Sequence, residues 1–256
     1  MGTVAIIDGR GLYFPINISM ELTTPKYRTD YIGETINTIR DDKTISYFVI
    51  PRDNIFIPSN VDSAIVLGNG ITRSNPQVQN LIGSNANKVG ASYKLVYACN
   101  RAISDPITYD YYVLKHRVFL AETPLNRLNQ VYLPYDAFLD YKDTCNLLPY
   151  VSHLDSGASA AYLAAFDGHK KVFLFGFDGY IGTWRTMYDG RFPYENGDTN
   201  IDYKGWDDFM YNVISVYKDT EFYRIQLDGQ EAPDRWQALP NFQDVTIRQA
   251  VLLGDF

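Results

Sequence analysis

The stretch Ala64-Ile65-Val66-Leu67-Gly68-Asn69-Gly70 decides how the rest of the chain is interpreted. Its first four residues are apolar without alternation, which is typical of a parallel strand that is covered on both faces. The two glycines that follow let a backbone approach a ligand closely. No third glycine and no Gly-Lys-Ser/Thr follows at the required spacing, so the stretch is neither the dinucleotide fingerprint nor a P-loop. A plain tight turn is therefore the alternative interpretation.

Two more predicted strands end in polar or glycine-containing turns. Tyr93–Ala98 runs into Cys99-Asn100, and the predicted buried strand Lys171–Phe175 is followed by Gly176-Phe177-Asp178-Gly179-Tyr180. Because these strands alternate with helical stretches, the sequence predicts an α/β fold. The expected architecture is a Rossmann-like, mostly parallel sheet with helices on both faces.

The clearest predicted helix is the alanine-rich segment Ser156–Phe166, with Ser156 as its N-cap and Gly168 at its end. It leads directly into the strand at Lys171, as the second half of a βαβ unit does. The remaining predicted elements are strands at Tyr109–Leu114, Gln130–Leu133 and Phe222–Leu227, a helix at Tyr203–Tyr217 and one more strand within Val245–Leu252.

The first 63 residues follow a different pattern, with short apolar pieces broken by turn residues. Val4–Ile7 and Ile45–Ile50 are strand-like, and the second of them is closed by a proline. We therefore expect two parts, a β-rich N-terminal appendage over residues 1–63 and a Rossmann-like nucleotide-binding domain over residues 64–256.

Composition narrows the class of protein. Among 256 residues, 23 are basic and 30 acidic, so the net charge of −7 disfavours attachment to nucleic-acid phosphate or anionic lipid. No apolar run is long enough for a membrane span, and no secretory signal is visible at the start, so a cytoplasmic protein is expected. The 21 tyrosines and 14 phenylalanines suit either sugar and base contacts or an ordinary core.

The polar residues at the predicted strand ends are candidates for ligand binding, because the carboxyl ends of parallel strands share one edge. Asn69 and Asn100 offer amide groups to a ribose or phosphate, and Ser156 with the first-turn amides of its helix offers an anion site. Asp178 offers an acceptor to sugar or base hydroxyls. The alternatives are a simple helix cap for Ser156 and a structural turn for Asp178.

The ordered set of these motifs resembles the bacterial sialyltransferases of glycosyltransferase family forty-two. The motifs are Ile65–Gly70, Cys99-Asn100, Ser156-Gly157 and Val172–Tyr180, and the resemblance spans roughly residues 64–227. They are equally similar to a related group that includes 6-hydroxymethylpterin pyrophosphokinase-like proteins and uncharacterised phage-encoded proteins.

The resemblance implies a site for a nucleotide, which is a CMP-sugar in the sialyltransferases. It implies that Tyr180 binds the leaving phosphate, with Tyr188 as the second tyrosine that does so. The residues that it implies at the nucleotide are Gly68, Asn69, Gly70, Asn100, Ser156, Gly157 and Asp178.

One departure from the family concerns the catalytic base. The sialyltransferases carry a histidine before the long helix that follows the Gly-x-Asp-x-Tyr loop, and the corresponding stretch 198–206 has none. Asp202 and Tyr203 stand near that place, but a solvated Asp with a pKa of about 3.9 is a weak base and a Tyr at about 10 is rarely ionised. His153 lies just before Ser156 and is the other candidate for a chemical role.

Metal and disulfide chemistry are not predicted. Cys99 and Cys145 with three histidines show no zinc-ligand spacing. The adjacent pairs Asp41-Asp42 and Asp207-Asp208 are interpreted as solvated surface, because neighbouring side chains on a helix point in different directions. Diphosphoryl transfer with a metal-held triphosphate therefore has little support, and no metal cofactor is expected.

Two functions remain open at this point. The first is a glycosyltransferase-like enzyme that moves a glycosyl group from a nucleotide sugar to a glycan or other hydroxyl acceptor. The second is a non-catalytic structural or accessory component of a phage particle, located in the virion. The missing histidine and the β-rich first 63 residues motivate the second, because exposed strand edges are assembly surfaces for a homo-oligomer or particle.

Overall fold

A computed structural model gives the fold of the protein. It describes the backbone of residues 3–6, 12–13, 34–40 and 43–49, and, beyond these, residues 62–89, 92–105, 109–115, 117–120, 123, 130–134, 137, 141, 144–148, 154–178, 203–227, 231–254 and 256. Within this part of the chain, no helix has the length and apolar composition needed to span a bilayer.

The main sheet has eight strands in the order β12-β11-β10-β5-β6-β7-β8-β9, and every neighbouring pair is parallel. This confirms the predicted Rossmann-like α/β fold. The strands are β5 (Ser63–Leu67), β6 (Leu95–Cys99), β7 (Tyr111–Val113), β8 (Val131–Leu133), β9 (Asn146–Leu147), β10 (Lys171–Phe175), β11 (Glu221–Ile225) and β12 (Phe242–Val245).

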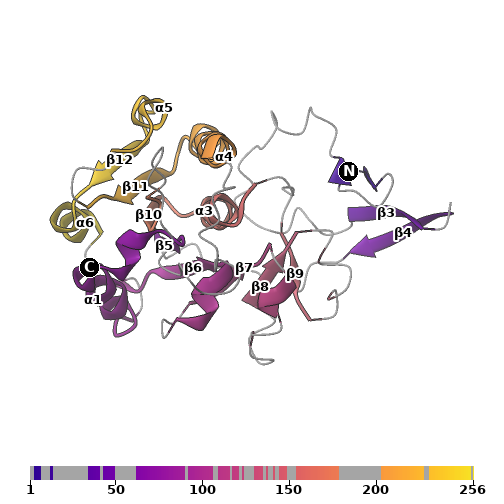
Figure 1. The fold of residues 1–256 in the computed structure, drawn as a ribbon, viewed down its shortest axis with the longest axis horizontal. Helices are drawn as coiled ribbons and strands as arrows, with labels where there is room; N and C mark the ends of the chain where they lie inside the picture. Colours follow the sequence, from indigo (N-terminus) through magenta and orange to yellow (C-terminus); the bar gives the residue numbers. More distant parts are fainter. Residues whose placement is uncertain are drawn as a thin grey trace.

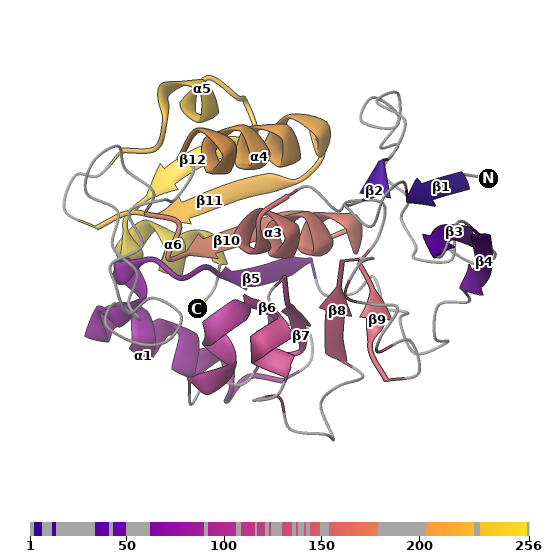
Figure 2. The ribbon, with the colours of Figure 1, turned by 45° about the vertical axis from the view of Figure 1, so that its right-hand side comes forward.

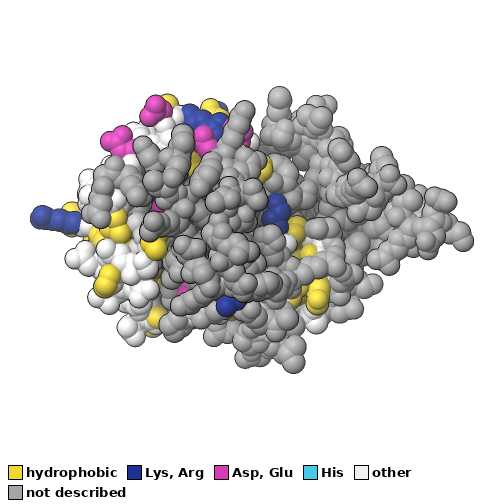
Figure 3. All heavy atoms as spheres, viewed as in Figure 1, with side chains coloured by type: hydrophobic (Ala, Val, Ile, Leu, Met, Phe, Trp, Pro, Cys, Tyr) yellow, Lys and Arg dark blue, Asp and Glu magenta, His cyan; other side chains and the backbone are white. Residues whose placement is uncertain are grey.

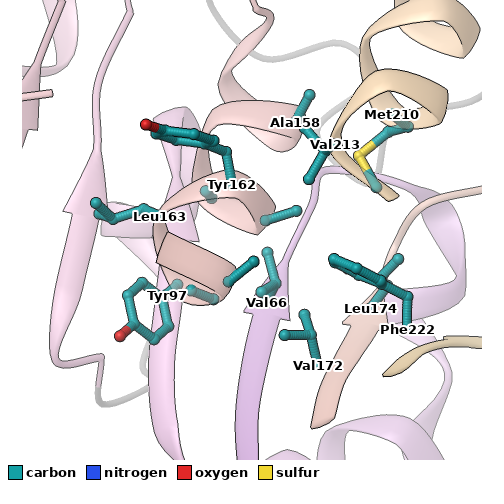
Figure 4. Close-up of a cluster of buried hydrophobic side chains, with 14 of the residues drawn as sticks. Val66, Tyr97, Ala158, Tyr162, Leu163, Val172, Leu174, Met210, Val213 and Phe222 are labelled. Carbon is teal, nitrogen blue, oxygen red and sulfur yellow. The ribbon is translucent and has the colours of Figure 1, made fainter. Parts of the chain in front are cut away.

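Helices cover both faces of this sheet (Figures 1 and 2). Side chains alternate along β5, so Ala64 and Val66 join the core under one set of helices while Ile65 and Leu67 join the core under the other. Figure 4 shows the first core, where α3 and α4 lie over β5, β10 and β11. The helices of the first face are α3 (Ser156–Phe166), α4 (Tyr203–Val216) and α5 (Asp234–Gln237), and those of the second are α1 (Pro76–Asn85) and α6 (Ile247–Gly254).

The strand order places a topological switch point between β5 and β10. From β5 the chain proceeds through β6 to β9 on one side, and then returns to β10 on the other side of β5 and continues outward to β12. In open α/β sheets, ligands bind outside the carboxyl ends of the strands at such a point. The glycine turns after β5 and β10 are therefore neighbours at the edge where a ligand is expected.

The N-terminal residues contribute a second sheet, as the β-rich pattern predicted. Its order is β2-β1-β3-β4, with β1 parallel to β3 and the other pairs antiparallel. The strands are β1 (Thr3–Ile6), β2 (Leu12–Tyr13), β3 (Glu34–Arg40) and β4 (Lys43–Val49). The division into domains at residue 63 stays a prediction.

The prediction for the C-terminal tail was wrong. A strand was expected within Val245–Leu252, whereas β12 ends at Val245 and α6 occupies most of that range. The cause is a capping box: Thr246 N–H donates to Gln249 Oε1 at 2.8 Å, and Gln249 N–H donates to Thr246 Oγ1 at 3.3 Å. The two side chains satisfy each other's free amides and start a helix.

Asp207 and Asp208, which were interpreted as solvated surface, have side chains that are 28% and 43% exposed, and they share one basic partner that the sequence did not indicate. Arg235 Nε donates to Asp207 Oδ1 at 2.7 Å, and its NH1 contacts Asp208 Oδ1. Acidic and basic side chains accordingly lie together over α4 and α5 (Figure 3). One guanidinium is wide enough to reach both neighbouring carboxylates.

Many of the tyrosines belong to the core. Tyr97, Tyr112, Tyr132, Tyr162 and Tyr217 are each no more than 1% exposed. Several are in ring contact, for instance Tyr97 with Tyr111 at a centroid distance of 5.3 Å. Among the described residues, these tyrosines therefore serve to pack the core, which was one of the two interpretations of the tyrosine content. They do not form a sugar-binding surface.

Candidate functional site

The glycine turn after β5 continues the pairing with β10 beyond the strands. Gly68 N–H donates to Phe175 O and Gly70 N–H donates to Gly176 O, both at 2.8 Å. A Cβ on Gly68 would lie 2.5 Å from Gly176 O, and one on Gly70 would lie 2.7 Å from the same oxygen. Glycine is thus needed at both positions because the two turns lie against each other.

Asp178 closes this turn from the β10 side. Its Oδ2 accepts a hydrogen bond from Thr72 N–H at 2.7 Å, and the side chain is 5% exposed. Burial raises the pKa of Asp178 from 3.8 to about 6, although the Thr72 bond and the nearby Arg224 and Arg73 counteract the rise. The carboxyl therefore holds the β5 turn in place, and its proposed contact with a sugar hydroxyl stays a prediction.

The titration of Asp178 predicts how stability depends on pH. A folded-state pKa near 6, above the unfolded value of about 3.9, means that the folded protein holds the proton more tightly. This contribution is fully present below about pH 4 and is lost as the pH rises through about 6. Asp178→Asn keeps an acceptor for Thr72 without the titration. Relative to the parent, its free energy of unfolding should rise by on the order of 2–3 kcal/mol between about pH 4 and pH 7, measured by urea denaturation. A difference that is constant with pH would contradict the assignment.

Arg73 holds the turn after β5 through a buried hydrogen bond. Its NH1 donates to Gly68 O at 2.5 Å, and its NH2 forms an ion pair with Asp105, beyond the end of β6. Gly176 has φ +73°, and a Cβ there would lie 2.9 Å from Arg73 Cδ. The side chain is fully buried, so its charge is compensated by Asp105 rather than by solvent.

Asn100 and Ser156 meet although 56 residues separate them. Ser156 Oγ donates to Asn100 Oδ1 at 3.0 Å, and Lys115 N–H donates to the same oxygen at 3.4 Å. Asn100 adopts φ 44°, a left-handed conformation that Asn tolerates better than most residues. Because Oδ1 accepts both bonds, the Nδ2 of Asn100 is the end that is able to donate to a ligand.

The N-cap of α3 is Asp155 and not Ser156, which corrects the predicted cap. Asp155 Oδ1 accepts from Ala158 N–H at 2.7 Å. Burial raises the pKa of Asp155, and the amides of Ala158 and Gly157 and the nearby Lys115 counteract the rise. Since Asp155 caps α3, the Ser156 hydroxyl donates to Asn100 Oδ1 instead of to the helix amides.

Phe177 links the two glycine-containing segments. A Cβ on Gly68 would lie 3.1 Å from Phe177 Cε2, and one on Gly157 would lie 3.5 Å from Phe177 Cε1. The phenyl ring is 2% exposed, so it forms the floor between the β5 turn and the start of α3. We call this group the switch-point cluster, which consists of Gly68, Asn69, Gly70, Thr72, Asn100, Asp155, Ser156, Gly157, Phe177 and Asp178.

The cluster brings together all seven residues that were predicted at the nucleotide, as their shared sheet edge implied. Tyr180, Tyr188, His153 and Asp202 lie outside the described residues, so their predicted roles stay predictions. His169 is described, and it lies buried between α3 and β10 with Nε2 3.0 Å from Tyr97 Oη.

Sequence reasoning missed Lys115, which lies just beyond the end of β7. Its Nζ donates to Leu154 O at 2.7 Å, next to the start of α3. The signal that was available is its place directly after a predicted strand, the same signal that identified Asn100. The contact brings the charge of Lys115 close to the start of α3, where it also interacts with Asp155.

Cys99 is not suited to nucleophilic chemistry. Burial raises the pKa of its thiol to about 12, while the charge of Arg73 counteracts the rise and Asp155 adds to it. The thiol donates to Leu67 O at 3.4 Å. Within the described part of the chain, no three His, Cys, Asp or Glu side chains gather where a metal ion would be held.

The chain is similar to solved structures of sialyltransferases. It is 14% identical to the monofunctional α-2,3-sialyltransferase Cst-I of Campylobacter jejuni, with a TM-score of 0.49 over 75% of this chain and 85% of that one. It is 13% identical to an apo α-2,3-sialyltransferase of the same organism (TM-score 0.43, 68% and 79% covered). It is 15% identical to CstII of that organism in complex with cytidine-5′-monophosphate (TM-score 0.38, 64% and 79% covered). No protein-family model and no curated protein matches the chain.

Proposed function

We propose that the switch-point cluster binds a nucleotide and that the protein is a glycosyltransferase with a nucleotide-sugar donor. The supporting observation is that four segments distant in the chain meet beyond the carboxyl ends of the neighbouring strands β5 and β10. The bond from Ser156 to Asn100 and the contact of Asp178 with the β5 turn join these parts. Parallel sheets bind ligands at this place, and polar groups that converge there favour a binding role over four unrelated structural turns.

The chemistry of the cluster suits a nucleoside better than a simple anion. Asn100 offers an amide donor, and Ile71, which is 43% exposed directly after the glycine turn, is the proposed apolar contact for the base. The motif resemblance names CMP-sugars as the donors to try first, and CstII is the neighbour solved with CMP. Transfer to a glycan or other hydroxyl acceptor is part of the same proposal.

For the reaction, the acceptor oxygen forms a bond to the anomeric carbon while the bond from that carbon to the phosphate oxygen breaks. The acceptor proton goes to a base, for which His153 and Asp202 are the proposed candidates, and Tyr180 and Tyr188 are proposed to stabilise the phosphate that leaves. Tyrosine hydroxyls aimed at a developing negative charge do this without a metal ion.

A calorimetric titration with CMP tests the binding proposal. Asn100→Asp keeps the shape and the left-handed backbone but replaces the donating amide by a negatively charged acceptor. We expect saturable binding by the parent and an affinity about tenfold or more weaker in the variant, since a lost donor and a new charge each cost about 1 kcal/mol.

Asn87→Asp provides the matched control, because Asn87 is exposed beyond the end of α1 and the charge change is the same. It should bind CMP like the parent. Flat titrations of the parent with CMP, UDP, GDP and their sugars would contradict the proposed function.

A further inference from the structure

Asp155 carries a buried carboxylate oxygen that has no hydrogen-bond donor among the described residues. Its Oδ1 accepts from Ala158 N–H at 2.7 Å, whereas Oδ2 is without a partner. An acceptor that is buried and unpaired is costly, and in folded proteins almost every such group has a partner. A donor from an ordered water or from a bound molecule is therefore expected at this oxygen.

The same carboxylate stands where an anion would otherwise bind. The first amides of a helix such as α3, which has 11 residues, are a common phosphate site. Here the amides of Ala158 and Gly157 already interact with Asp155. A phosphate at this helix end would find its donors engaged and would face a like charge.

Burial raises the pKa of Asp155, and the neighbours of this carboxyl counteract the rise. Lys115 Nζ lies beside the start of α3, bonded to Leu154 O at 2.7 Å, and its charge favours the ionised carboxyl. On the other side, Gly157 leaves room for the carboxylate, since a Cβ there would lie 3.3 Å from Asp155 Oδ1. The carboxylate thus lies within the switch-point cluster, where it contacts the start of α3.

We propose that Asp155 makes the α3 end of the switch-point cluster a position for a ligand hydroxyl and keeps the ligand's phosphate away from the helix N-terminus. This deepens the proposed function and depends on it. The group recognised is an uncharged hydrogen-bond donor, such as a hydroxyl of a ribose or of the transferred sugar, which donates to Oδ2.

The test compares the affinities of CMP and cytidine, two ligands that differ by one phosphate. Asp155→Ser keeps a good N-cap for α3 but has no charge, and Asp155→Asn keeps the shape. In both variants we expect the ratio of CMP affinity to cytidine affinity to rise about tenfold over the parent, because phosphate repulsion is removed. The weakened hydroxyl acceptor lowers the affinity of both ligands alike and cancels in the ratio.

Asp62→Asn is the control for net charge. Asp62 precedes β5 at the opposite edge of the sheet, and its side chain is 60% exposed beside Lys170. In this variant the ratio of CMP affinity to cytidine affinity should equal that of the parent. If the parent binds CMP and the Asp155 variants leave the ratio unchanged, the role of Asp155 is overturned while the nucleotide site stands. If neither the parent nor any variant binds CMP or cytidine, the proposed function itself fails. The proposed role of Asp155 then fails with it.

Discussion

Gly70→Ala should destabilise the protein by about 3 kcal/mol, because a methyl group has no room in the turn after β5. The new Cβ would lie 2.3 Å from Asp178 Oδ2 and 2.7 Å from Gly176 O. The first atom is held by Thr72 N–H and the second by Gly70 N–H, so neither moves without breaking a buried bond. Urea denaturation at neutral pH measures the change.

Gly83→Ala is the matched control for this substitution. Gly83 lies within α1, and a Cβ there would meet nothing within 4 Å. Alanine in a helix interior is favoured over glycine, so this variant should be more stable than the parent by about 0.5–1 kcal/mol. A loss of less than about 1 kcal/mol for Gly70→Ala would contradict the close approach of the two turns.

Arg73→Met should cost about 3–5 kcal/mol, the range for removing one partner of a buried ion pair. The loss would leave Asp105, whose side chain is 10% exposed, and Gly68 O without their donor. Methionine fills much of the same volume, so the effect reports the lost charge and hydrogen bonds rather than a cavity. The free energy of unfolding from urea denaturation is again the measurement.

Lys170→Met serves as the control for Arg73→Met, since both changes exchange a paired cation for methionine. The pair of Lys170 with Asp62 spans 3.1 Å, and its side chains are 70% and 60% exposed. Exposed pairs contribute about 0–1 kcal/mol, so this variant should resemble the parent. Equal losses for both variants would show that Arg73 is not buried as described.

The main sheet was predictable because its central strands are short apolar runs closed by turn residues. β5, β6 and β10 were all found in this way, and α3 was found from its alanine-rich composition. The short α1 was not predicted, although Asn75 followed by Pro76 is a start signal: Asn75 Oδ1 accepts from Gln77 N–H at 2.8 Å. In the tail, Thr246 and Gln249 carried a capping-box signal that outweighs the apolar pattern of a strand.

The sequence was enough to predict that the candidate residues lie at one edge of the sheet. It was not enough to predict which side chains bond to one another. Parallel strands alone imply that Asn100 and Ser156 share an edge. In contrast, Asp155 and Ser156 are both good N-cap residues, and the sequence does not say which one caps α3. The pairing of Arg73 with Asp105 depends on tertiary burial across 32 residues, for which no periodic pattern exists.

Buried charges around the switch point show how the fold prepares this site. Arg224 donates to both carboxylate oxygens of Asp244, at 2.6 and 2.9 Å, and to Phe177 O at 3.3 Å. Together with Arg73 it fixes the backbone on both sides of the β5 and β10 turns. A site held by such pairs keeps its shape without a ligand, which lowers the cost of binding.

A crystal structure of the protein grown with CMP tests the central claim most directly. The nucleotide-site account predicts density for CMP at the carboxyl ends of β5, β6 and β10, in contact with Asn69, Asn100 and Ser156. It also predicts that a hydroxyl, and not the phosphate, faces Asp155. Density for CMP bound elsewhere on the protein, or a switch-point cluster left unchanged and empty at saturating CMP, would contradict it.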